Sequence, residues 1–380
     1  MLYIIKENRT YDQVLGDLKD ASGKPMGNGD PHLTLFGEDV SPNHHQFARE
    51  YVLFDNLYCN SEVSVDGHSW CDGAIATDYR QRQWTVRYTK HGQLPGNDEM
   101  STPAEGWLWD LCKRHGVSFK CYGEGEKDVP KDNRGTWPGG RDMHKVDGWI
   151  GDLKKAETTG DLPRFMIMSL GEDHTRGTKP GEHTPQAMVA SNDIALGKIV
   201  AAASRSKFWK EMAIFVIEDD AQNGPDHVDA HRTVGFVISP YIKRGMIDST
   251  PYTTTSMVRT MELILGLAPL TQHDAAATPM YESFTNTPTL TPYKALPAQI
   301  DVTTRNTATA YGAKQSARMD WSDYDRINED ELNEILWHSI KGVDVPMPAP
   351  VRRALPMGDG RMHAPVAHAD ADDDDQEEER

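Results

Sequence analysis

Short apolar segments alternate along this chain with segments whose apolar residues recur at helical spacing. The clearest apolar runs cover residues 2–5, 165–170 and 213–217, and each has the length of a buried strand. Residues 188–204 follow a Thr-Pro pair, a typical helix start, and repeat their apolar residues at helical spacing. This order of elements predicts an α/β fold with a mostly parallel central sheet and helices on both of its faces.

The same reasoning places the remaining elements. We expect further helices at residues 11–18, 64–79, 105–115 and 254–265, and further strands at 54–58, 117–122 and 234–238. Residues 80–160 otherwise show weak periodicity, and we interpret them as a loop-rich insertion around the sheet. We expect one domain over residues 1–345, followed at 346–380 by a disordered tail rich in Pro and Ala and then in acidic residues.

Polar clusters follow three of the predicted strands. These clusters are Glu7-Asn8, Glu172-Asp173-His174 and Glu218-Asp219-Asp220. The carboxyl ends of parallel strands meet at one edge of a sheet, where ligands collect, so we expect the clusters to converge. Adjacent carboxylates such as those of Asp219 and Asp220 repel one another unless a cation lies between them. The sequence therefore predicts a metal centre at this edge.

A fourth polar segment lies between the strands predicted at 213–217 and 234–238. Residues 226–231 place two Asp and two His residues within six positions. Imidazole nitrogen together with carboxylate oxygen suits Zn²⁺, Mn²⁺ or a mixed site. This segment strengthens the prediction of a metal centre.

A hydroxyl that such a metal could activate lies near the start of the helix predicted at 64–79. Ser64 would begin this helix, where free backbone N–H groups favour an anionic substrate such as phosphate. A serine in this position is commonly a simple N-cap, but beside a metal it becomes a candidate nucleophile, since coordination lowers the pKa of the hydroxyl. Ser61 is the second candidate.

Two segments resemble a known family. The sequence from Glu7 to Asp12 resembles the E-N-R-[ST]-[FY]-D motif of the phosphoesterase family that includes bacterial acid phosphatases and non-haemolytic phospholipases C. The acidic pair before residue 221, Asp-His-Val at 226–228 and Ile-Ser-Pro-Tyr at 238–241 resemble the later motifs of that family. The resemblance extends from residue 1 to about residue 345. It implies an alkaline-phosphatase-like fold and a metal-assisted attack by Ser or Thr on phosphorus.

The resemblance also implies a role for individual residues. The implied catalytic residues are Ser64, as the nucleophile that forms a phosphoseryl intermediate, His68, which would contact the substrate or its surroundings, and His227. The implied metal ligands are Glu7, Asn8, Asp173, His174, Asp219, Asp220 and His231.

The same resemblance implies that these ligands form two separate metal-binding sets. Glu7, Asp219 and Asp220 would hold one metal with Ser64, while Asn8 would also help to fix the phosphoryl group. Asp173, His174 and His231 would form the other set, and His227 would be a ligand or the acid for the leaving group. We expect one or two divalent ions, with Zn²⁺, Mn²⁺, Mg²⁺ and Ca²⁺ left open.

Three readings of the function follow. The first is a metal-dependent hydrolase of phosphate mono- or diesters acting on a small phosphorylated substrate. The alternatives are a phospholipase C-like phosphodiesterase and a non-catalytic, cation-stabilised binding protein; the histidines argue against the latter, because a structural Ca²⁺ site uses oxygen ligands. A sulfatase is less favoured, since Asp66 and His68 replace the Pro and Arg of its C/S-x-P-x-R pattern.

Charge and hydropathy limit the partners. The chain has 40 Lys and Arg against 58 Asp and Glu, a net charge of −18, which argues against nucleic acid or an anionic membrane surface. No stretch approaches the roughly 20 apolar residues needed to cross a bilayer. The family resemblance implies a periplasmic or extracellular location. The first predicted strand has no leader before it, so we expect the natural sequence to begin upstream. Four Cys residues are compatible with two disulfides or with reduced thiols.

Overall fold

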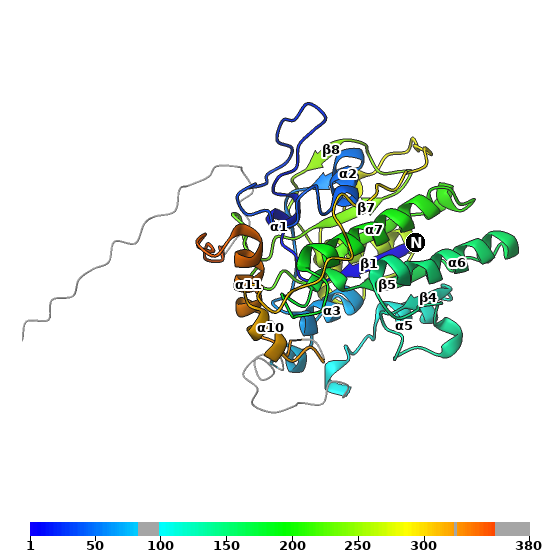
Figure 1. Ribbon diagram of the computed structural model, residues 1–380. Coiled ribbons are helices and arrows are strands. Elements are labelled where there is room, and N and C mark those ends of the chain that lie inside the picture. Colours follow the sequence, from blue (N-terminus) through cyan, green and yellow to red (C-terminus); the bar gives the residue numbers. More distant parts are fainter. Residues whose placement is uncertain (83–98, 323–324, 354–380) are drawn as a thin grey trace, which may run out of the picture.

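The structure is a computed structural model, and it describes residues 1–82, 99–322 and 325–353. Its centre is a five-stranded sheet with the strand order β4-β5-β1-β6-β7 (Figure 1). The strands are β1 (Leu2–Lys6), β4 (Phe119–Tyr122), β5 (Phe165–Leu170), β6 (Ile214–Glu218) and β7 (Gly235–Ile238). The first four run parallel, and β7 pairs antiparallel with β6 at one edge. The predicted α/β fold with a mostly parallel sheet is confirmed.

Helices cover both faces of this sheet. On one face, α7 (Pro185–Ala203) packs against α6 (Asp142–Thr159) and α2 (Pro42–Glu50) (Figure 1). On the other face, α3 (Ser64–Gly73) packs against α8 (Thr254–Leu265).

Strand β7 contacts the helices of both faces, because successive side chains of a strand point to opposite faces of the sheet. Phe236 contacts the Phe47 ring of α2 at 5.7 Å between centroids. The preceding position, Gly235, faces Met257 of α8. Burial on both faces explains why the central strands are continuous apolar runs rather than alternating ones.

The remaining elements surround this core. The shorter helices are α1 (Tyr11–Leu15), α5 (Leu108–Arg114), α9 (Gln272–Ala276), α10 (Ala313–Arg318) and α11 (Glu329–Lys341). Short 3₁₀ segments cover Glu99–Ser101, Lys131–Asn133, Glu172–His174, Trp209–Glu211 and Tyr281–Ser283. Two small parallel pairs lie outside the central sheet: β2 (Val52–Phe54) with β8 (Met246–Asp248), and β3 (Leu57–Tyr58) with β9 (Tyr252–Thr253).

Several element boundaries differ from the predicted ones. The strand expected at 54–58 is instead split into β2 and β3. At the break, the side chain of Asn56 donates to Ser249 O (2.9 Å), before β9, and its carbonyl accepts from Tyr252 N (3.0 Å), at the start of β9. The helix expected at 64–79 ends at Gly73, where Ala74 adopts a left-handed conformation with φ of 54°.

The largest difference is α6, which places eighteen helical residues in the region interpreted as loops. Its buried residues Val146, Trp149, Leu153 and Ala156 recur every three or four positions, so a helical signal was present. Two glycines and many charged residues within the same segment obscured it. Residues 83–98 of the expected insertion and the acidic part of the expected tail, 354–380, lie outside the described residues.

Two further findings concern the chain as a whole. The four cysteines are buried and unpaired, so the disulfide alternative does not hold in this structure. Among the residues that the structure describes, none of the helices has the length and apolar content to cross a membrane.

A buried carboxyl in the core predicts how stability depends on pH. Burial, together with hydrogen bonding and repulsion from Asp274, raises the pKa of Glu262 in α8 from 4.5 to about 9. A raised pKa in the folded state stabilises the fold below the unfolded pKa, and this stabilisation is lost as pH rises through about 9. Between about pH 6 and about pH 10 we therefore expect the Tm of wild type to fall more steeply than that of Glu262→Gln. The exposed Glu282→Gln should follow wild type, and parallel curves for all three proteins would contradict this prediction.

Candidate active site

Three strand ends bring acidic side chains to one edge of the sheet. In the register of β1, Lys6 lies beside Leu170 of β5 on one side and Glu218 of β6 on the other. The polar residues that follow are therefore neighbours. Asp219 N donates to Lys6 O (2.9 Å), and Glu7 N donates to Asp173 Oδ1 (3.1 Å). The expected convergence of the strand-end clusters is observed.

Helix α3 adds a hydroxyl and an imidazole to this edge. Ser64 and His68 lie four residues apart and so share one face of the helix. Ser64 Oγ lies 3.5 Å from Glu7 Oε2 and 3.2 Å from the side-chain amide of Asn8. His68 Nε2 lies 3.3 Å from Glu7 Oε1 and 3.6 Å from Asp219 Oδ2. Ser64, Glu7, Asn8 and Asp219 are buried, so these contacts form in a largely dry site.

The close approach of α3 depends on two small residues. A Cβ at Gly67 would lie 2.8 Å from the Asp219 carbonyl oxygen, so any larger residue would push the helix away from the strand end. Ser61 Oγ donates to the same carbonyl at 2.6 Å. Ser61, the second candidate nucleophile, therefore holds the backbone of Asp219 in place.

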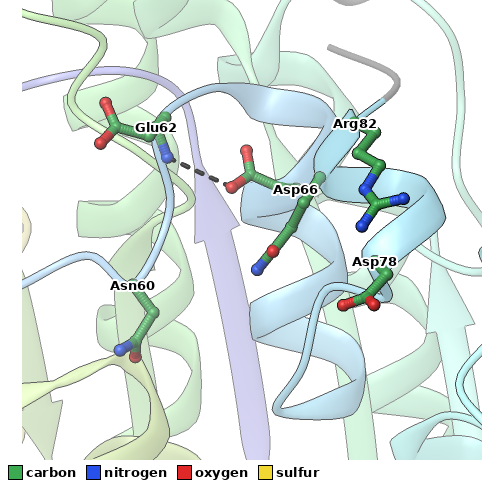
Figure 2. A pocket seen from close by; sticks show the side chains of 6 residues that line it. Asn60, Glu62, Asp66, Asp78 and Arg82 are labelled. Atoms are coloured by element: carbon green, nitrogen blue, oxygen red, sulfur yellow. Dashed lines mark hydrogen bonds between the residues drawn. The ribbon is translucent and has the colours of Figure 1, made fainter. Parts of the chain in front are cut away.

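The side chain of Asp66, in the first turn of α3, binds the backbone just before the helix. Asp66 accepts hydrogen bonds from Val63 N (3.0 Å) and Glu62 N (3.3 Å), and Figure 2 shows the latter bond. This carboxylate borders a hollow of about 470 Å³ whose wall also includes Asp78 and Arg82 (Figure 2). Asp66 thus accepts from the two backbone N–H groups that precede α3. The next two backbone N–H groups, those of Ser64 and Val65, do not bond to Asp66 and need a different acceptor.

That acceptor is Asp325, which precedes α11. Its two carboxylate oxygens accept from Ser64 N (3.1 Å) and Val65 N (2.6 Å), and Gln222 Nε2 also donates to it (2.9 Å). Burial is the main cause that raises the pKa of Asp325 to about 7. The start of α3 thus binds an anionic group. Sequence reasoning missed Asp325, since a single Asp about 260 positions from Ser64 carries no local signal.

Asp219 and Asp220 carry buried oxygens without hydrogen-bond partners. Within the part of the chain that the structure describes, both oxygens of Asp220 and Oδ2 of Asp219 have none, although both residues are fully buried. Burial first, and then neighbouring carboxylates, raise the pKa of both groups well above the usual range. Buried carboxylates of this kind are costly unless a cation satisfies them. Donor atoms of Glu7, His68 and Asp219 lie within 4.8 Å of one another. These residues fit a divalent cation.

The residues of the second expected ligand set, Asp173, His174 and His231, each have a charged partner of their own in the structure. Asp173 Oδ2 lies 2.8 Å from Lys6 Nζ, so this carboxylate already has a buried cation as its partner. His174 Nε2 lies 3.1 Å from Glu329 Oε1 of α11. Burial lowers the pKa of His174, but Glu329 outweighs this effect and raises it to about 9.

His231 has separate partners as well. Its Nδ1 lies 2.8 Å from Asp229 Oδ1, and its Nε2 lies 3.2 Å from Glu62 Oε1. The hydrogen bond with Asp229 is the largest cause that raises the pKa of His231 to about 9, and the bond with Glu62 is the second largest. Both ring nitrogens of His231 therefore already have carboxylate partners outside the Ser64 cluster.

His227 belongs to a different cluster from Ser64. Its Nδ1 lies 2.6 Å from Asp12 Oδ2, and the two form a compact group with Asp226. The fully buried Arg232 lies 2.9 Å from Asp12 and 3.1 Å from Asp226, so this acidic group already contains its cation. Among the described residues, no hydrogen bond or ion pair joins His227 to Ser64.

A cleft of about 790 Å³ opens onto the nucleophile candidate. Ser64 and Glu7 line it together with Asp325. Its other walls include Arg141, Lys145, His174, Arg176, His183, Arg305, Trp321 and Glu329. The cleft therefore lies beside Ser64, and its basic side chains suit a small anionic ester.

The mostly parallel α/β sheet, with a serine at a helix start beside buried strand-end carboxylates, agrees with the alkaline-phosphatase-like fold that the sequence predicted. Residues 28–268 match the model of the Phosphoesterase family, and the chain belongs to this family. Glu7 and Asn8 precede the matched range. The predicted family and the prediction of an ester-bond hydrolase are confirmed.

Solved structures agree on the fold. The chain is similar to a protein in the alkaline phosphatase superfamily from Vibrio parahaemolyticus, with 18% identity and a TM-score of 0.51, over 73% of this chain and 68% of that one. It is also similar to a 2-O GAG sulfatase, with 12% identity and a TM-score of 0.50, over 78% of this chain and 76% of that one. No curated protein matches the chain in sequence.

Proposed function

We propose that this protein is a divalent-metal-dependent phosphoesterase with Ser64 as its nucleophile, acting on phosphate mono- or diesters of small molecules. The observation that carries the proposal is the position of Ser64 Oγ, at the start of α3 and 3.5 Å from Glu7. Beside it lie the buried carboxylates of Asp219 and Asp220, of which Asp219 Oδ2 and both oxygens of Asp220 have no hydrogen-bond partner among the described residues.

The residues of the chain divide the chemistry between them. The N–H groups of Ser64 and Val65 would bind phosphoryl oxygens in place of the Asp325 carboxylate. Glu7 Oε2, 3.5 Å from Ser64 Oγ, is placed to take the hydroxyl proton.

The bond from Ser64 Oγ to phosphorus forms as the bond to the leaving-group oxygen breaks, and that oxygen departs with the electron pair and takes up a proton from solvent. Water then attacks the phosphorus of the phosphoserine and releases phosphate from a monoester substrate, or a phosphate monoester from a diester. The serine oxygen regains its proton from Glu7, and the proton lost by the water returns to solvent. When bound by Glu7, Asp219 and Asp220, a divalent cation would neutralise phosphoryl charge and lower the pKa of the serine.

The proposal is tested by turnover with and without metal. The purified protein is treated with chelator, dialysed, and assayed after addition of Mn²⁺, Zn²⁺, Mg²⁺ or Ca²⁺, each alone. The substrates are the p-nitrophenyl esters of phosphate, as monoester and diester, and of sulfate. We expect turnover of a phosphate ester that chelator removes and one of these metals restores. Chelator-resistant turnover, or hydrolysis of the sulfate ester alone, would overturn the proposal.

Asp325 competes with the substrate in this proposal. Replacing it by Asn removes the negative charge from the amides of Ser64 and Val65, and we expect inorganic phosphate to inhibit Asp325→Asn about three- to tenfold more strongly than wild type, since a charged hydrogen bond is worth more than a neutral one. The measurement is the inhibition constant of phosphate at fixed metal concentration. The exposed Asp330→Asn should behave as wild type. Weaker phosphate inhibition in Asp325→Asn would show that this carboxylate does not compete with the ligand.

A further inference from the structure

We propose that His68 is a ligand of the metal and that Glu124 is the residue that positions it, so that the site selects a first-row transition ion over Ca²⁺ and Mg²⁺. This inference rests on the proposed function and names its cofactor. It also changes the role of His68, which the family resemblance placed against the substrate.

The first step is the direction in which the imidazole points. His68 Nε2 lies between two carboxylates, 3.3 Å from Glu7 Oε1 and 3.6 Å from Asp219 Oδ2. Ligand atoms that share one ion at about 2.0–2.2 Å lie roughly 3–4 Å apart. The two distances from Nε2 thus have the spacing of a common coordination sphere, and all three donors lie within 4.8 Å of one another. Helical geometry produces it, because His68 is one turn after Ser64 on the same face of α3.

The second step is charge. A protonated His68 could serve as the cation for Glu7 and Asp219, but it would leave Asp220 unexplained. Asp220 is fully buried and directly follows Asp219, and neither of its oxygens has a hydrogen-bond partner among the residues at 1–82, 99–322 and 325–353. One imidazolium cannot compensate three buried carboxylates, and unpaired buried charge is strongly unfavourable. A divalent ion compensates them better, and His68 then contributes a lone pair rather than a proton.

The third step is the group behind the ring. His68 Nδ1 lies 3.1 Å from Glu124 Oε2, and Glu124 is buried. By distance this contact is an ion pair, while a hydrogen bond of the ring joins Nε2 to Glu7 Oε1 (3.3 Å). Around a bound metal, Glu124 would instead accept the Nδ1–H bond and leave the lone pair on Nε2, the atom that faces Glu7 and Asp219. Carboxylate, histidine and metal in this order is a common arrangement in metalloproteins.

The loop that carries Glu124 is suited to this positioning. Gly123 and Gly125 on either side of it have φ values of 80° and 62°, a left-handed conformation that favours glycine. At these two positions a Cβ would collide with Trp137 and Trp109, so both indoles pack directly on the loop backbone. Glu124 is therefore presented to His68 from a tightly packed segment.

The ligand chemistry decides which ion fits. Ca²⁺ and Mg²⁺ are bound by oxygen ligands, whereas an imidazole nitrogen favours first-row transition ions such as Zn²⁺, Fe²⁺ or Co²⁺. A site of one imidazole with Glu7, Asp219 and Asp220 has mixed nitrogen and oxygen donors. The proposed site is therefore a transition-metal centre.

The test measures metal binding rather than turnover. Wild type, His68→Asn, Glu124→Gln and, as the matched control in the same loop, Glu126→Gln are stripped with chelator. Each is then titrated with Co²⁺ and followed by visible absorption, and the Zn²⁺ dissociation constant is measured by competition with a chelating dye. Circular dichroism and the Tm in chelator report whether each variant is folded.

We expect His68→Asn to raise the Zn²⁺ dissociation constant at least about 100-fold and to change the Co²⁺ spectrum, since a nitrogen ligand is lost. For Glu124→Gln we expect a rise of about 10- to 100-fold with a smaller spectral change. Glu126→Gln should match wild type. A folded His68→Asn with unchanged Zn²⁺ affinity and Co²⁺ spectrum would overturn the assignment, as would a wild-type protein that binds Ca²⁺ or Mg²⁺ more tightly than Zn²⁺.

These outcomes are separate from the fate of the proposed function. If His68 and Glu124 control metal binding but no phosphate ester is hydrolysed, the metal assignment stands and the activity fails. If metal-dependent hydrolysis occurs and both variants bind Zn²⁺ as wild type does, the activity stands and the ligand assignment fails.

Discussion

Ser64→Ala is expected to lower kcat for phosphate ester hydrolysis by about three to six orders of magnitude, since removal of a nucleophile has effects of this size. The fold should be unaffected, because the Ser64 hydroxyl makes two long side-chain hydrogen bonds to the described residues, at 3.2 Å and 3.5 Å. The measurements are kcat at saturating metal and the phosphoserine that remains after acid quenching of a ³²P-labelled substrate. Wild type should trap this label on Ser64, and Ser64→Ala should trap none.

Ser61→Ala is the matched control for this experiment. Ser61 donates to the backbone carbonyl of Asp219 and has a structural role, so its loss should cost at most about tenfold in kcat through a small shift of Asp219. Near-normal turnover in Ser64→Ala, or a trapped label that disappears only in Ser61→Ala, would assign the nucleophile to Ser61 instead.

Asp220→Asn is expected to act in opposite directions on the metal-free and the metal-loaded protein. At about pH 8 in chelator, the substitution removes a buried carboxylate that has no partner, and we expect the Tm to rise by roughly 2–5 °C. In saturating metal the same variant should melt below wild type and should lose most of its activity, because a ligand of the ion is gone. Thermal melts in chelator and in metal, run side by side, give both values.

Glu218→Gln is the contrasting variant two positions earlier. Glu218 is buried as well, but Lys6 Nζ lies 2.5 Å from its Oε1. Its replacement leaves Lys6 with one carboxylate partner fewer, so we expect destabilisation both in chelator and in metal. An equal loss of stability in chelator for Asp220→Asn and Glu218→Gln would show that Asp220 is compensated within the protein and does not await a cation.

Much of the fold could be predicted from local patterns. The apolar runs at 2–5, 165–170 and 213–217 correspond to β1, β5 and β6, because strands buried on both faces must be apolar at every position. Helix α7 begins behind Thr184, whose side chain accepts from Ala187 N as the Thr-Pro signal predicts. These features depend on a few neighbouring residues, and local reasoning is sufficient for them.

The candidate site was predicted in part. Glu7, Asn8, Asp219 and Ser64 do meet, because parallel strands place their carboxyl ends at one edge and the start of α3 faces that edge. The second ligand set does not meet. The residues of this set lie in sequence positions like those of the site residues: Asp173 and His174 follow a strand end, and His231 lies in a polar segment. Each has its own charged partner, which the sequence does not reveal.

Partners that are remote in the chain were decided by the tertiary structure alone. Glu124 reaches His68 across 56 positions from a loop with weak periodicity, and Asp325 reaches the start of α3 across about 260 positions. A strand or helix follows from short-range spacing and burial, so the sequence by itself determined the sheet, its acidic edge and the family. Whether a buried charge is paired with a lysine, a histidine or a cation depends on which distant side chain packs beside it, and only the folded chain decides that.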